Sequence, residues 1–178
     1  MAPTPAQLVQ RLLAPDCGPF ALLHRRTPGH PEGIVEVLLG PIEEAGLLTG
    51  IALPAGAPGA PVTDALALVP YRQIHERGFD VRDDGTPLTV LRPREAYELL
   101  LAGLLAALPG REVRVEGGAF DVADEDYAAI VRRVVEDEIG RGEGANFVIR
   151  RTFRGTVPDW GPGAALALFG RLLRGERG

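Results

Sequence analysis

The chain has 178 residues, of which 46% are hydrophobic and 24% are charged, and its formal net charge is −5. This composition is typical of a globular protein and argues against nucleic-acid binding, because no basic surface would persist among so many carboxylates. The longest apolar stretch, 99–108, is about half the length of a membrane span, and the N-terminus carries no secretory signal. We therefore expect a cytoplasmic protein that contacts neither nucleic acid nor membrane.

Two missing residue types restrict the chemistry further. All 19 basic residues are arginines, which excludes lysine chemistry within this chain, whether as Schiff base, Walker lysine or general base. Serine is absent as well, so a serine-type catalytic triad is excluded. Cys17 is the single cysteine; it rules out an internal disulfide and fits a reducing compartment.

The first half of the chain is predicted to consist mainly of strands. Thr4 and Pro5 are the expected N-cap and first residue of a helix that runs to about Leu13. Strand propensity and turn residues predict strands at 20–25, 33–39 and 65–71, and a short one near 47–53. The turn signal at 83–85 predicts a hairpin between 79–82 and 87–91.

The second half is predicted to contain three helices and two strands. The helices span about 94–108, 124–139 and 162–174, and the strands lie within 111–122 and at 146–153. Asp124 is the expected cap of the middle helix, and Gly140 and Gly142 are expected to end it. Because the order lacks a regular strand–helix–strand rhythm and hairpin signals favour antiparallel pairing, we predict an α+β fold in a single domain over 1–178.

Three motifs receive structural interpretations. The glycines of GRGEG at 140–144 follow a helix and precede a predicted strand, the reverse of a phosphate-binding loop, so they are interpreted as a helix end and tight turn. The histidines His24, His30 and His75 lack metal-ligand spacing. The acidic clusters at 121–126 and 136–138 match no cation loop. We therefore predict no metal site within the chain.

One long motif is more specific. The segment EDYAAIVRRVVEDEIGRGEGANFVIRRTF (125–153) resembles the helix–turn–strand that begins the chorismate-binding part of anthranilate synthase component I and its relatives. Its EIGRGEGANFVI is most similar to the 2-amino-2-deoxyisochorismate synthases of phenazine and enediyne pathways. The segments ALVPYRQIHERGFDVRDDGTPL (67–88) and AALALFGRLLRGERG (164–178) also resemble that subgroup. The resemblance thus extends over 20–178.

The resemblance implies a reaction. Members of this family displace the hydroxyl of chorismate with magnesium assistance, using water, ammonia or a lysine side chain as nucleophile. Water-adding members carry a lysine general base at the position of Asn146. Because an amide cannot take a proton from water, ammonia is the implied nucleophile and 2-amino-2-deoxyisochorismate the implied product, with anthranilate as the alternative. Ammonia would come from a glutamine amidotransferase domain or subunit. The alternative for Asn146 is an ordinary polar residue beside a turn.

The sequence also departs from the family pattern. Tryptophan-sensing members carry Leu-Leu-Glu-Ser where this chain has Leu22, Leu23, His24 and Arg25, so no tryptophan feedback is expected. The family's catalytic histidine, magnesium-binding glutamates and substrate-carboxylate ligands follow the helix that ends here in RGERG. The resemblance therefore implies an N-terminal portion that is inactive alone, without its C-terminal catalytic part, and that exposes apolar surface, with a homodimer possible. A non-catalytic binding or scaffold module with the same fold is the alternative; a complete small enzyme is disfavoured.

Overall fold

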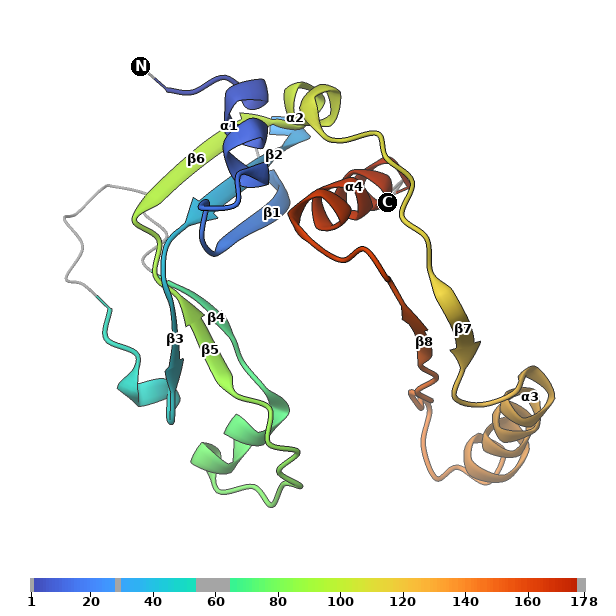
Figure 1. Cartoon of the computed structure of the whole chain (residues 1–178). Helices are drawn as coiled ribbons and strands as arrows, with labels where there is room; N and C mark the ends of the chain where they lie inside the picture. Colours follow the sequence, from blue (N-terminus) through green and yellow to red (C-terminus); the bar gives the residue numbers. More distant parts are fainter. Residues whose placement is uncertain (1, 28–29, 54–64, 176–178) are drawn as a thin grey trace. The chain divides into compact units, whose positions relative to one another are not determined.

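The computed structural model describes residues 2–27, 30–53 and 65–175, which fall into two compact units. Unit 1 is Met1–Pro109 and unit 2 is Gly110–Gly178 (Figure 1). Each unit combines helices with antiparallel strands, and every strand pairing among the described residues is antiparallel. The predicted α+β class is confirmed. Within the described ranges, no helix is both long and apolar enough to cross a membrane.

The first sheet of unit 1 has the strand order β1-β2-β6. Helices α1 and α2 contact each other, and α2 also packs on β2 and β6 (Figure 1). The predicted strands at 20–25 and 33–39 are confirmed as an antiparallel pair, although the turn residues 28–29 lie outside the described part of the chain. The elements are α1 (Pro5–Leu13), β1 (Phe20–Thr27), β2 (His30–Leu39), β6 (Glu95–Leu100) and α2 (Leu101–Ala107).

Helix α1 forms as its sequence predicts. Thr4 is the N-cap: its side chain accepts a hydrogen bond from the Gln7 amide, and the Gln7 side chain accepts one from the Thr4 amide. This capping box satisfies two amides that the helix itself leaves unpaired. Leu8, Val9 and Leu12 form one stripe that is almost completely buried. The capping box and the buried stripe thus both favour the nine-residue helix Pro5–Leu13.

The predicted helix at 94–108 is wrong in its first half. Residues 95–100 form β6, which pairs with the outer edge of β2 from Ile34↔Leu100 to Leu39↔Glu95. Only Leu101–Ala107 is helical. The free edge of β2 offers unpaired backbone groups that 95–100 satisfies as a strand, and this long-range pairing overrides local helix propensity.

The second sheet of unit 1 has the order β3-β5-β4. Because β5 is paired on both edges, it has no edge left for 79–82, and the predicted hairpin partner there is not a strand. The strand expected near 47–53 is also wrong, since a 3₁₀ turn occupies this stretch. The strand expected at 65–71 is shorter than predicted. The elements are β3 (Ile42–Ala45), η1 (Leu48–Gly50), β4 (Leu66–Leu68), η2 (Tyr71–Arg77) and β5 (Leu88–Leu91).

The two sheets of unit 1 are joined by a continuous antiparallel ribbon. β2 runs into β3 and β5 runs into β6, and both partners pair across the join. At the join, the two residues 40–41 face the three residues 92–94, an irregularity of the kind found in β-bulges. The Arg92 amide donates to the Pro41 carbonyl at 2.9 Å, and the Arg94 amide donates to the Leu39 carbonyl at 2.8 Å. Gly40 therefore lies directly against the opposite backbone.

Unit 2 contains a two-stranded sheet, β7–β8, with a helical excursion between its strands. Its small core consists of Val113, Ala164 and Ala167, with Val157 and Leu168 packed against them. The last helix is confirmed. The elements are β7 (Glu116–Phe120), α3 (Asp124–Arg133), the π-helix η3 (Val134–Ile139), β8 (Phe153–Thr156) and α4 (Pro162–Gly175).

Two details of unit 2 differ from the prediction. Ala123, rather than Asp124, is the N-cap of α3; Asp124 lies in the first turn, where its charge complements the helix dipole. The strand expected at 146–153 begins only at Phe153. Its pairing partner β7 ends at Phe120, and no strand among the described residues lies beside 146–152 to satisfy their backbone. Asn146 therefore lies in an irregular segment.

Candidate functional site

The candidate site is the helix–turn segment 124–153. Near the end of this segment, Arg151 contacts residues at and just before its beginning. The Arg151 Nε donates to the Val122 carbonyl at 2.9 Å, and Nη2 forms an ion pair with Asp124. The guanidinium carbon lies 3.9 Å from the Phe120 ring centroid and 5.3 Å from that of Tyr127. Cation–π contact and hydrogen bonds thus join the end of the segment to the start of α3.

Two further contacts reinforce this closure. The Tyr127 hydroxyl donates to the Ile149 carbonyl at 3.3 Å. The amides of Asp121 and Thr152 each bond across the junction at 2.9 Å, Asp121 to the Thr152 carbonyl and Thr152 to the Asp121 carboxylate. The hydrogen bond from the Thr152 amide lowers the pKa of Asp121. The base of the segment is therefore held at residues 149, 151 and 152.

The glycine-rich turn closes the helical end of the segment, as predicted. The Gly142 amide donates to the Ile139 carbonyl at 3.0 Å, and the Glu143 amide donates to the Glu138 carbonyl at 2.9 Å. Gly142 has φ +81°, a left-handed conformation that favours glycine. Backbone carbonyls at the C-terminal end of a helix carry partial negative charge, so this turn is built to end a helix.

Asn146 follows the turn and is exposed to solvent. The ring of Phe147 lies so close to Gly144 that a Cβ on this glycine would be 2.9 Å from the ring. No hydrogen bond of the Asn146 side chain is found among the described residues, so its amide is available to a ligand. Its catalytic role stays a prediction.

The other residues considered from the sequence do not meet at one place. His24 lies on β1 with Nε2 buried and unpaired, whereas Nδ1 of His75 lies 2.6 Å from the Arg72 carbonyl oxygen. The side chain of His30 is outside the described part of the chain. Across 2–27, 30–53 and 65–175, no group of three His, Cys, Asp or Glu residues could hold a metal ion.

The motif around 70–88 has a structural role that the sequence did not reveal. Gln73 is only 2% exposed, and its Nε2 donates to Glu76 at 2.6 Å and to the Gly46 carbonyl at 3.2 Å. Glu76 in turn accepts the Leu48 amide. Arg72 donates from Nε to the Thr86 carbonyl at 2.8 Å. The bonds to Gly46 and Leu48 thus join η2 to the stretch that contains η1.

A charged cluster in unit 1 was also missed by sequence reasoning. Arg11 Nη1 and Nη2 bind the two carboxylate oxygens of Glu95 at 2.7 and 2.5 Å, and the Tyr97 hydroxyl donates to Glu95 at 2.5 Å. These bonds lower the pKa of Glu95 to about 2 and raise the pKa values of Arg11 and Tyr97. The cluster borders a cavity of about 310 Å³ that also includes Cys17, whose pKa is raised by burial.

The Glu95 cluster predicts acid sensitivity of unit 1. Because the pKa of Glu95 falls from its ordinary value of 4.5 to about 2 on folding, the charged carboxylate stabilises the folded state above pH 4.5. This contribution is lost as the pH falls from 4.5 toward 2. Glu95→Gln should therefore flatten the pH dependence of the melting temperature in this window. The control Glu98→Gln, on the same strand, should keep the slope of the parent chain; equal slopes for all three proteins would contradict the prediction.

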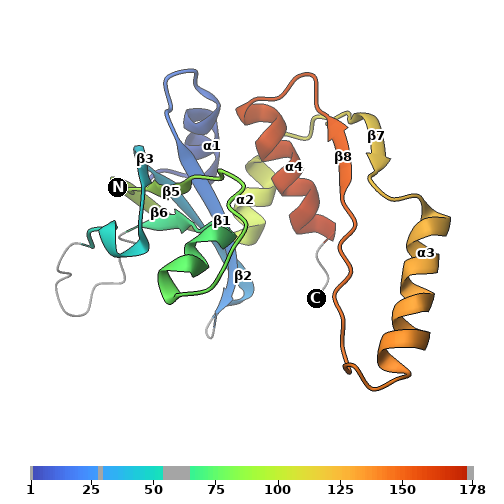
Figure 2. The same ribbon diagram turned by 90° about the horizontal axis from the view of Figure 1, so that it is seen from below.

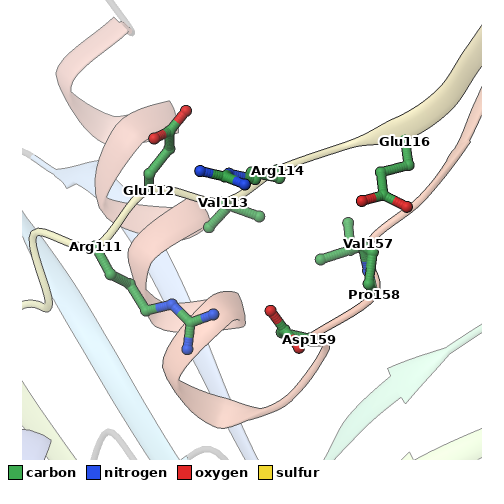
Figure 3. A pocket seen from close by; sticks show the side chains of 8 residues that line it. All are labelled: Arg111, Glu112, Val113, Arg114, Glu116, Val157, Pro158 and Asp159. Carbon is green, nitrogen blue, oxygen red and sulfur yellow. The ribbon is translucent and has the colours of Figure 1, made fainter.

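Unit 2 contains a small polar hollow of about 190 Å³ between the approach to β7 and the segment after β8 (Figure 3). Arg111, Arg114, Glu116 and Asp159 line it together with the buried Val113. Both signs of charge are present, and no ion pair among the described residues joins these four side chains. The hollow lacks the converging partners that would select one ligand.

Comparison with known proteins gives a consistent family assignment. No protein-family model matches the chain. The chain is 45% identical over 178 residues to "Anthranilate synthase, phenazine specific" of Pseudomonas chlororaphis, and 42% identical over 178 residues to the protein of the same name from Pseudomonas fluorescens. Each alignment covers 100% of this chain but 28% of the relative, so the chain spans little more than a quarter of their length. The resemblance predicted from the motifs is confirmed: over its whole length, the chain is similar to part of the phenazine-specific anthranilate synthases.

Proposed function

We propose that the chain is part of a synthase that aminates chorismate at C2 with ammonia released from glutamine, giving 2-amino-2-deoxyisochorismate for secondary metabolism. The observation that carries this proposal is the 42–45% identity over the entire chain to phenazine-specific anthranilate synthases. Asn146 supports ammonia rather than water as the nucleophile, because an amide cannot serve as the general base that water requires. Ammonia carries its own lone pair at the attacking atom and needs no such base.

The remainder of the synthase is the first proposed partner of this chain. Helix α3 and the π-helix η3 contain no buried residue, although their apolar side chains recur at helical spacing. Val135 is 52% exposed, Phe147 is 41% exposed and Val148 is 94% exposed. An apolar surface of this kind is typical of a face that another part of a protein covers. The relatives have the length to supply that part.

The proposal includes three further components that this chain does not supply: a source of ammonia, a second subunit and a metal ion. A glutamine amidotransferase domain or subunit would supply ammonia, and a homodimer would be the assembly. Magnesium would supply polarisation of the leaving hydroxyl. We assign no step of the reaction to magnesium held by this chain.

The proposal predicts the product of the complete synthase. With chorismate and ammonium, the purified protein that contains this chain and its remainder should form 2-amino-2-deoxyisochorismate without releasing pyruvate. The second candidate product is anthranilate, favoured by the name of both relatives, and its formation would release pyruvate in equal amount. Product analysis by chromatography and mass spectrometry distinguishes the two. Isochorismate as the main product, or no consumption of chorismate, would contradict the proposal; the 178-residue chain alone serves as the control expected to be inactive.

A further inference from the structure

The segment that carries Asn146 is held in place by side chains rather than by secondary structure. Residues 146–152 form no strand and no helix among the described residues. The stretch runs beside α3 before it enters β8 (Figure 2). Because no backbone ladder fixes this stretch, the position of Asn146 depends on the few contacts before and after it.

Arg151 makes most of the contacts that follow Asn146. Its side chain is 18% exposed, whereas the side chain of its ion-pair partner Asp124 is 87% exposed. An ion pair with so exposed a partner contributes little. The fixed elements are therefore the 2.9 Å hydrogen bond to the Val122 carbonyl and the stacking on Phe120 and Tyr127. Both join Arg151 to residues at the base of the segment.

The planar guanidinium is suited to this position. It stacks on aromatic rings while its N–H groups donate in the ring plane, which a lysine ammonium cannot reproduce. Tyr127, one of the stacked rings, also donates its hydroxyl to the Ile149 carbonyl at 3.3 Å. A second contact spans Asn146, because the ring of Phe147 lies against Gly144. Asn146 is thus bracketed by two packed anchor points.

We propose that Arg151 is a positioning residue that acts through Asn146: it holds the irregular segment so that the Asn146 amide meets the incoming ammonia. This inference rests on the proposed function. A displacement of about 1 Å at a reacting group can cost on the order of 100-fold in rate, so loosening the anchor five residues away is expected to be visible in the kinetics.

The test uses the complete synthase with ammonium as nitrogen donor. Arg151→Gln should lower kcat/KM for ammonia by about 10- to 100-fold while it changes KM for chorismate less than about twofold. Arg151→Lys should recover only part of the loss, because the charge returns without the planar stack. The matched control is Arg150→Gln: this neighbouring side chain is exposed and should leave both constants unchanged.

A double-mutant cycle shows whether Arg151 acts through Asn146. In an Asn146→Ala background, Arg151→Gln should change kcat/KM for ammonia by less than about twofold, because the group it positions is gone. A loss that persists at full size in that background would overturn the proposal. So would an equal loss of kcat/KM for ammonia and chorismate, which would indicate a general structural defect.

Hydrogen exchange separates failure of this inference from failure of the proposed function. The hydrogen-bonded amides of Asp121 and Thr152, which close the base of the segment, should exchange faster in Arg151→Gln than in Arg150→Gln, and unchanged exchange would overturn the positioning role. A parent synthase that does not aminate chorismate would refute the proposed function. In that case the exchange result alone would decide whether Arg151 positions the segment.

Discussion

Leu12→Ala is expected to lower the free energy of unfolding of unit 1 by about 2–5 kcal/mol. Leu12 is 0% exposed and lies with Leu8 and Val9 on the buried stripe of α1. Truncation removes the transfer free energy of the deleted carbons and leaves a cavity that a close-packed interior fills only in part. The helix itself should survive, because alanine has the highest helix propensity and the Thr4 capping box is untouched.

Hydrogen exchange of the β2 amides measures this loss for unit 1. The matched control is Leu100→Ala, which deletes the same atoms from a side chain that is 55% exposed. This control should stay within about 0.5 kcal/mol of the parent chain. Equal losses in the two variants would show that burial of Leu12 does not stabilise the unit.

Gly40→Ala should destabilise unit 1 by about 1–3 kcal/mol through overpacking. A Cβ at this position would collide with the carbonyl oxygen of Arg92 and lie 2.8 Å from its carbonyl carbon and 3.0 Å from the Arg94 nitrogen. These are backbone atoms, and both neighbouring amides are already hydrogen bonded to 39–41. The ribbon must therefore separate at its join, since no flexible side chain can move away instead.

Urea denaturation followed by circular dichroism tests this expectation, with Gly50→Ala as the control. A Cβ on Gly50 would meet no atom within 4 Å, and its φ lies outside the positive range. The control should therefore match the parent chain or exceed it slightly, since alanine reduces the entropy of the unfolded chain. A Gly40→Ala protein as stable as this control would show that the join tolerates a side chain.

Local signals were sufficient for the elements whose stabilising partners are near in the sequence. The start and apolar stripe of α1 and the end of the π-helix at the glycine turn depend on residues within a few positions of each other, and the β1–β2 pair joins two strands that are consecutive in the chain. The motif at 125–153 was sufficient to predict the resemblance to anthranilate synthases, which two relatives aligned over the whole of this chain confirm. Asn146 was singled out by the same wording, and the structure adds its exposure and the contacts around it.

The sequence could not predict elements that depend on a distant partner. The sequence of residues 95–100 predicts a helix. In the structure, the edge of β2, some sixty positions earlier, pairs with these residues and they form a strand. The sequence of 146–152 predicts a strand. Because β7 ends at Phe120, this stretch has no neighbouring strand with which to form backbone hydrogen bonds. A strand is stabilised by hydrogen bonds to another strand, so its existence is decided by what lies beside it and not by its own residues.

The sequence by itself therefore determined the class of fold and the resemblance to anthranilate synthases, and it singled out Asn146 as the residue proposed to govern the choice of nucleophile. Only the tertiary structure decided how that residue is held: the Arg151 guanidinium reaches 29 positions back to the Val122 carbonyl and stacks on Phe120 and Tyr127. A sequence motif consists of consecutive residues, so it can be identified without knowledge of the fold. A cation–π stack or a carbonyl contact forms only when folding brings separate segments within a few ångströms of each other.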